Sequence, residues 1–417
     1  MSLKKLNDIR FTKGNGGMGR DAGSDDVITG LIFGGLELSM AAVTQNGTTT
    51  PADVSGFEAV DADTFVRKFT YPEELEDLGI VLTPVPETGS LTAKQKAVNA
   101  LHYHITEFFR MNPEGVLYVM VKNENTAAAV ADITVLQTFA GGNIRQIGVF
   151  NSTMLAIADV QAQCTSLEEN HRPLSVVLTY SGKAGADLNT LKSNTSLAVA
   201  GQCNVSLLIG CDADTGLAAL LGDFAFYGCI GACMGAISKA AVHENIAWVG
   251  KFPLGLKAPA LFNGNLIRNI ATSDLEVLHN NRYIFPVIHA GDADNYFNDS
   301  HTLDVDSSDY AYIENVRTID KACRGIRSKL LPWLNSPLKV DPDTGKLDTS
   351  TVAFLETTAG EALEEMEKAG ELSGYKAEID PDQNVISTSE VEIIIKKVPV
   401  GVMRKVHIKI GFTSKLS

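Results

Sequence analysis

The chain has 417 residues, of which 45% are hydrophobic and 20% charged, and its formal net charge is −15. This composition excludes a disordered chain, and its length suffices for a sizeable core and two or more domains. The acidic balance argues against general nucleic-acid binding, which needs a basic surface.

Basic residues gather at both ends of the chain. Residues 1–20 hold five basic residues against Asp8, a net charge of +4, and residues 396–417 hold six and no acid, +6. The part between them therefore carries −25. Basic ends on an acidic body fit ends that lie against the same protein or against other copies of it, and solvated tails fit equally well.

In chain order, residues 1–26 predict an extended arm, because a glycine cluster is followed by polar residues. Residues 27–290 predict an α/β body with room for an inserted subdomain. Its short apolar strands alternate with helices, which is typical of a mostly parallel sheet flanked by helices on both faces. Strands are expected at 116–121, 144–150, 174–180 and 205–209, and helices at 94–109, 127–139, 152–167 and 217–242.

Asp212 and Asp214 come just after the strand expected at 205–209, where open α/β sheets place ligands and catalytic carboxylates. They resemble the Asp-x-Asp motif of the haloacid dehalogenase family, which would make the chain a metal-dependent hydrolase or phosphotransferase. The match is poor because Gly216 stands where that motif has Thr or Val. A polar loop that caps the next helix is the favoured interpretation.

A second acidic stretch at 289–309 begins like a calcium loop. It has Phe297 and Leu303 where such a loop needs glycine and glutamate, so a solvated acidic loop is expected. A calcium-dependent binding module is kept as an alternative. The histidines and the six cysteines are scattered without ligand spacing, so we predict no metal, no cofactor and no catalytic residue.

The last quarter predicts two helices and a pair of strands, an α+β domain at 291–403 with a strand arm at 404–417. The first helix stops at Pro332, and the second runs from Thr349 or Ser350 to Gly370. Strands are expected at 390–398 and 404–412. On the first helix, Arg317, Lys321 and Arg324 share a stripe apart from its apolar residues.

The strand at 404–412 alternates between two faces. One face is apolar and the other basic, with Val406, Ile408, Ile410 and Phe412 on the first and Lys405, His407 and Lys409 on the second. A terminal strand of this kind must join a sheet edge, in its own subunit or in a neighbour.

This order of segments resembles the contractile tail sheath proteins of phages and related injection machines. The resemblance rests on Tyr-Ile-Glu-Asn-Val-Arg-Thr-Ile-Asp-Lys-Ala at 312–322, on Gly-Glu-Leu-Ser-Gly at 370–374, and on Ile-Asp-Pro and Val-Pro-Val-Gly at 379–381 and 398–401. Weaker similarity is present at 296–302 and 16–30. The resemblance covers the last quarter of the chain firmly and the N-terminal arm loosely.

The resemblance implies a structural protein and no enzyme, with terminal arms that add strands to the sheets of neighbouring subunits around an inner tail tube. Expected partners are other copies of the chain, the tail tube protein, and baseplate and tail terminator proteins, without nucleic acid or a membrane span. The expected location is a virion tail assembled in the bacterial host cytoplasm. Tube contact is expected through Arg317, Lys321 and Arg324, or through the Glu-rich face at 361–367. The alternative function is the metal-dependent hydrolase or phosphotransferase that uses Asp212 and Asp214.

Overall fold

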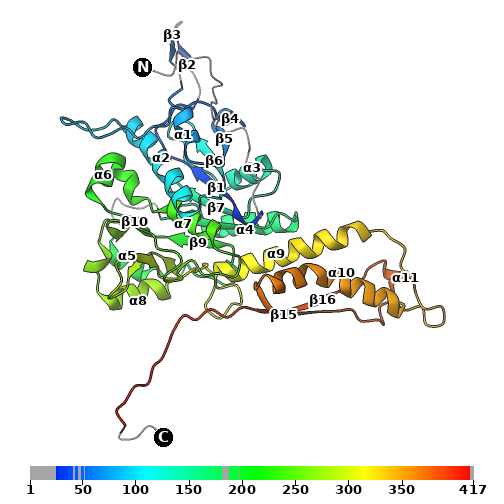
Figure 1. Ribbon diagram of the computed structural model, residues 1–417. Helices are drawn as coiled ribbons and strands as arrows, with labels where there is room; N and C mark the ends of the chain where they lie inside the picture. Colours follow the sequence, from blue (N-terminus) through cyan, green and yellow to red (C-terminus); the bar gives the residue numbers. More distant parts are fainter. Residues whose placement is uncertain are drawn as a thin grey trace, which may run out of the picture.

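The computed structural model of the chain describes residues 25–40, 43–45, 48–50, 52–180, 187–195 and 197–413 (Figure 1). The expected N-terminal arm therefore lies outside the described residues, except for its last two positions. Residues 414–417 at the other end also lie outside them.

An eight-stranded sheet organises the larger part of the chain, in the order β12-β9-β8-β7-β1-β6-β5-β4. All neighbours from β12 to β6 are parallel, and β5 and β4 add an antiparallel edge. Its strands are β1 (Ile28–Phe33), β4 (Glu58–Ala59), β5 (Thr64–Phe69), β6 (Val116–Lys122), β7 (Gln146–Phe150), β8 (Ser175–Thr179), β9 (Val205–Leu208) and β12 (Tyr283–Ile284).

Helices cover both faces of this sheet, as the apolar strands predicted. Leu31 and Phe33 of β1 point into a core shared with α2 (Ala93–Met111) and α7 (Ile230–Lys239). Ile32 points into a second core with α3 (Ala131–Phe139) and α4 (Ile157–Glu169). Successive side chains of a strand face opposite sides, so a strand covered on both sides reads as a continuous apolar run.

Shorter elements surround the sheet. Three antiparallel strand pairs are β2 (Val43–Gln45) with β3 (Thr48–Thr50), β10 (Gly210–Asp212) with β11 (Pro259–Leu261), and β13 (Pro286–Ile288) with β14 (Asn295–Phe297). The short helices are α1 (Glu74–Asp77), α5 (Leu188–Ser193), α6 (Thr215–Leu221) and α8 (Thr272–Asn280). Turns of 3-10 helix lie at Asp25–Val27, Gly222–Phe226, Ile267–Asn269 and Leu331–Trp333.

The single helix predicted at 217–242 is wrong. The segment forms α6, a 3-10 turn and α7, because Gly222 and Gly228 have positive φ values of 61° and 123° that end each helical run. Among the described residues, no single helix is long and apolar enough to cross a membrane. The segments Thr215–Phe226 and Ile230–Lys239 meet that test only as a pair bent by 81°. Every residue from Ile230 to Ser238 is buried in the fold.

The C-terminal part projects from the sheet as two helices that pack side by side, with a hairpin along the second (Figure 1). The elements are α9 (Ile313–Leu330), α10 (Thr349–Lys368), β15 (Leu372–Glu378), α11 (Val385–Thr388) and β16 (Ile394–Pro399). Both helices lie where they were predicted, and α10 begins after an Asp348 side-chain cap and is followed by Gly370 at φ 76°.

Three predictions for this part differ from the structure. The strand expected at 390–398 is β16, but its partner is β15, which the sequence did not predict because its Ser, Gly, Lys and Glu residues have low strand propensity. In the described chain, 404–412 has no regular secondary structure. The segment 295–304, expected as a solvated loop of the C-terminal domain, instead places Phe297 and Leu303 in the two cores of the sheet.

Close packing between α7 and α2 depends on glycine. An ideal Cβ on Gly231 would lie 2.1 Å from the carbonyl oxygen of His104 in α2, which is backbone and cannot turn away. We expect Gly231→Ala to lower the free energy of unfolding by at least about 2 kcal/mol in denaturant titrations. The control is Gly360→Ala in α10, where the new Cβ meets only the ring of Tyr375 at 3.2 Å. An equal loss in both variants would show that helix packing is not the cause.

Candidate functional site: the roots of the two terminal arms

Helix α9 contacts both points at which the predicted arms leave the folded body. The N-terminal root is Asp26, among the first described residues, and the C-terminal root is Arg404, which precedes the last described residues. Each root is a charged side chain held by opposite charges, and α9 supplies at least one of these charges at both.

Three cations of α9 hold the N-terminal root. The carboxylate of Asp26 lies 2.8 Å from both Lys321 Nζ and an Arg324 guanidinium nitrogen. Arg317 is only 4% exposed and donates to the backbone carbonyls of Ala240 and Asp26. Positions 317, 321 and 324 share one face because they follow helical spacing, so the three side chains reach the same place.

These contacts change the ionisation of the N-terminal root. Burial by itself would raise the pKa of the Asp26 carboxyl, but the hydrogen bond and charge of Lys321, together with Arg324 and Arg317, hold this pKa below its usual value. Burial lowers the pKa of Arg317 to about 10, so the guanidinium stays charged at neutral pH. Lys321 also lies 2.6 Å from Glu371, which links the root to the start of β15.

Arg317, Lys321 and Arg324, for which contact with a tube is predicted, have partners inside the chain, and their contact with a tube stays a prediction. The polar stripe of α9 faces the sheet domain, while Cys323 of its apolar stripe is exposed. Asp26 and the Ala240 carbonyl pair with these cations, and this pairing offsets the free energy that their burial costs.

Two carboxylates and an aromatic ring hold the C-terminal root. Arg404 Nε lies 3.0 Å from Asp299 Oδ2, and another nitrogen of the same guanidinium donates to Glu314 in the first turn of α9. The guanidinium carbon lies 3.5 Å from the ring centroid of Tyr312, a cation–π contact. Asn245 donates to both carboxylates, at 2.6 Å to Asp299 and 3.3 Å to Glu314.

Both carboxylates at this root are buried, Asp299 with 4% and Glu314 with 2% exposure. Burial raises the pKa of Glu314. Burial acts in the same direction on Asp299, but the charges of Arg404 and His301 and the hydrogen bonds from Asn245 and Ser300 together hold the pKa of that carboxyl below its usual value. Burial opposes the charge on Arg404, and Asp299 and Glu314 together raise its pKa above the usual value. The two buried carboxylates therefore depend on Arg404 to compensate their negative charge.

Beyond Arg404 the chain leaves the body as an extended segment, seen at the red end of the ribbon in Figure 1. Its apolar side chains become more exposed with distance from the root, from 62% at Val406 to 81% at Ile408 and 93% at Ile410, and Phe412 is fully exposed. Lys405 and Lys409 are exposed as well. The predicted apolar face is thus uncovered in the isolated chain.

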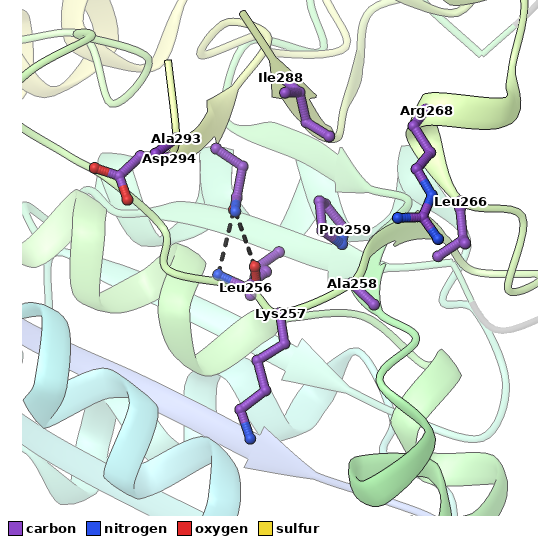
Figure 2. Close-up of a pocket in the computed structure, with 10 residues that line it drawn as sticks. Leu256, Lys257, Ala258, Pro259, Leu266, Arg268, Ile288, Ala293 and Asp294 are labelled. Atoms are coloured by element: carbon purple, nitrogen blue, oxygen red, sulfur yellow. Dashed lines mark hydrogen bonds between the residues drawn. The ribbon is translucent and has the colours of Figure 1, made fainter. Parts of the chain in front are cut away.

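The structure confirms the capping interpretation of the Asp212 loop. Asp212 accepts from the backbone N–H groups of Lys257 and Ala258 at 2.9 and 2.8 Å, and Asp214 caps α6 by accepting from Leu217 N–H at 3.1 Å. A cavity of about 160 Å³ is lined by residues that include Lys257, Arg268 and Asp294. Figure 2 shows these lining residues as sticks. The aspartates have structural partners, and the hydrolase alternative finds no support among the described residues.

Sequence reasoning missed most of the C-terminal root. The acidic pattern at 289–309 predicts a solvated loop for Asp299, and no pattern in the sequence marks Asn245. Tyr312 and Glu314 belong to the segment 312–322, on which the resemblance to sheath proteins rests. That segment is the sequence signal that could have identified these two residues of the root.

Comparison with known proteins supports the fold. Two family models match the chain, DUF2586, N-terminal domain, over residues 6–301 and DUF2586, C-terminal domain, over residues 309–417. No curated protein gives a significant match to the sequence.

Solved structures similar to the chain come from contractile systems. The helical sheath of the anti-feeding prophage in its contracted state has a TM-score of 0.58 and 13% identity, with 99% of this chain and 100% of that chain covered. A chain of the baseplate of the same system has a TM-score of 0.55 and 14% identity, with 99% of this chain and 100% of that chain covered. The contracted sheath of an extracellular contractile injection system, PVC, has a TM-score of 0.56 and 12% identity, with 100% of this chain and 99% of that chain covered. At these identities the likeness is one of fold, and at that level it confirms the resemblance stated from the sequence.

Removal of the C-terminal root cation leaves two buried carboxylates unpaired. We expect Arg404→Ala to lower the free energy of unfolding by roughly 3 kcal/mol, and Lys405→Ala, which removes a neighbouring exposed charge, to have little effect. Without Arg404 the folded pKa of Glu314, which burial already raises, increases further, and that of Asp299 rises above its unfolded value. Stability is then lost as pH rises through that interval, so the deficit in denaturant titrations is larger at about pH 8 than at about pH 5. A deficit that is the same at both pH values would contradict this account.

Proposed function

We propose a function for this chain from one premise: it belongs to the DUF2586 family, and its fold is that of contractile sheath proteins. The chain is a structural subunit of a contractile tail sheath or of the sheath of a related injection system. It polymerises as a helical tube around an inner tail tube. The observation that carries this proposal is the C-terminal segment, whose apolar and basic residues alternate and which is anchored at Arg404 and uncovered beyond it.

Such a segment gains most by joining a sheet of a neighbouring subunit. Strand addition supplies main-chain hydrogen bonds, and burial of four apolar side chains adds roughly 1.5–3 kcal/mol for each one that is fully covered. The hairpin of β15 and β16 is a suitable acceptor, because it is a two-stranded sheet and such sheets are marginal alone. The N-terminal arm that leads to Asp26 would join the same mesh.

Contraction requires subunits that change their packing without detaching. An arm fixed at a buried root and paired through its backbone to a neighbour is a tether, and the helix-covered sheet moves as a rigid body. Head-to-tail contacts that do not close generate helical filaments, the geometry of a sheath. No nucleotide or cofactor is needed in this scheme, since a metastable packing set at assembly stores the energy.

The finer assignments rest on the same proposal. The partners are other copies of this chain, an inner tail tube protein, and baseplate and tail terminator proteins, in a particle assembled in a bacterial host. For the tube, the candidate contacts are Arg317, Lys321 and Arg324 of α9 and the Glu-rich face of α10. On that face Glu361, Glu364, Glu365 and Glu367 are exposed. The chain acts without catalysis, and the Asp212 and Asp214 carboxylates serve its loop.

Removal of the C-terminal arm beyond its root should block assembly without unfolding the body. We expect a chain that ends at Lys405, which keeps Arg404, to retain the melting temperature of the full chain and to form no tubes in electron micrographs. Normal polymers from this shortened chain would overturn the role of the arm.

Matched point variants separate the two faces of the arm. Ile410→Asn places a polar group on the apolar face and should prevent polymerisation, whereas His407→Asn changes the opposite face and should leave it intact. Sedimentation of polymers measures both, and equal effects would contradict burial of one face only.

Salt should weaken the polymer, because basic arms approach acidic bodies. Between about 0.1 M and about 1 M sodium chloride the screening length falls from roughly 10 Å to 3 Å, and the polymerised fraction should fall with it. Light scattering follows this fraction. A fraction that does not respond to salt would exclude the electrostatic contribution while leaving strand addition intact.

A further inference from the structure

Two histidines and an aspartate converge beside the C-terminal root from distant parts of the sequence. His279 lies in the last turn of α8, and Asp299 and His301 follow β14. Each offers one ligand atom, and these three atoms all lie within 4.8 Å of one another. Nδ1 of His279 is 3.2 Å from Nε2 of His301. The fold thus assembles a ligand set that the sequence spacing did not reveal.

We propose that His279, Asp299 and His301 bind one divalent transition-metal ion of the zinc type. Zinc–nitrogen bonds of about 2.0–2.1 Å in tetrahedral geometry put neighbouring donors roughly 3.3 Å apart, close to the 3.2 Å between the two imidazoles. Two imidazoles and one carboxylate are a donor set that zinc accepts, with a water molecule in the fourth position. The carboxylate oxygen lies within 4.8 Å of both ring nitrogens, so ion binding requires these separations to close by up to roughly 1.5 Å.

Existing hydrogen bonds fix the carboxylate at this site. Asp299 Oδ1 accepts from Asn245 at 2.6 Å and from the backbone N–H of Ser300 at 2.9 Å, while Oδ2 accepts from Arg404 Nε at 3.0 Å. Arg404 would therefore act as an outer-shell group that orients the ligand oxygen, as hydrogen-bonded partners of metal ligands commonly do. The neighbouring Arg282 is itself paired with Asp306 at 3.0 Å, which moderates the positive charge around the ion.

The same residues stabilise the arm root, so metal and root are linked through Asp299. A bound ion would tie the end of α8 to the segment that holds Arg404, and it would reduce the freedom of that segment. This inference concerns binding by the isolated chain and does not depend on polymerisation. A failed sheath proposal and a failed metal proposal therefore give different results.

The test uses the full chain, stripped with a chelator and titrated with zinc by calorimetry and with cobalt(II) by visible absorption. We expect one ion per chain and a cobalt spectrum of low-coordinate nitrogen and oxygen ligation. His279→Gln should weaken binding by more than about 100-fold, because loss of a ligand exceeds the 10- to 100-fold cost of an outer-shell change. The matched control is His289→Gln, an exposed histidine outside the cluster, which should bind as the parent does.

Since His301 is buried, the half-buried His279 provides the decisive variant, and melting without metal verifies that it remains folded. Equal affinity in His279→Gln and in the parent would place the ion elsewhere and overturn the proposal. Absence of binding in the parent would overturn it too, and would leave the 3.2 Å contact as an imidazole–imidazole hydrogen bond.

Discussion

The charged face of α9 is the constraint on which the rest of this structure depends. Glu314 holds the cation from which the C-terminal arm departs, and Lys321 and Arg324 hold the carboxylate at which the described N-terminal part begins. A shift of this helix against the sheet would separate both sets of buried partners. Since an unpaired buried charge costs several kcal/mol, the helix, the sheet and the two roots behave as one rigid unit.

This arrangement divides the chain into a rigid body and exposed extensions. The sheet is covered on both faces, so its strands belong to the most stable part of the fold. Residues from Lys405 onward have neither secondary structure nor apolar cover in the described chain. A machine that repacks its subunits needs this division, because the body must keep its shape while the connections between bodies change direction.

The sequence predicted the elements whose pattern is local. Continuous apolar runs identified β6 to β9. Pro332 marked the end of the first long helix, and Thr349 or Ser350 and Gly370 marked the ends of the second. It failed where the deciding partner is remote: the bond from Arg324 to Asp26 spans 298 residues, so hydrophobic periodicity did not reveal that Arg317 of the polar stripe is buried as Val316 of the apolar stripe is. The apolar segment at 217–242 looked like one helix for a related reason, because a fully buried segment shows no face that would reveal its breaks.

The two roots have opposite polarity, and this matters for how the charges act. The N-terminal root is the carboxylate of Asp26 among cations, and the C-terminal root is the cation of Arg404 between carboxylates. At both roots the carboxylates are at least nine-tenths buried. Mobile ions screen exposed charges strongly and buried pairs weakly. Salt therefore screens the charges on the exposed arm more strongly than the root pairs, in which buried carboxylates meet partly exposed cations. Because of this difference, a change in ionic strength acts mainly on the contacts that the arm makes and less on its attachment to the body.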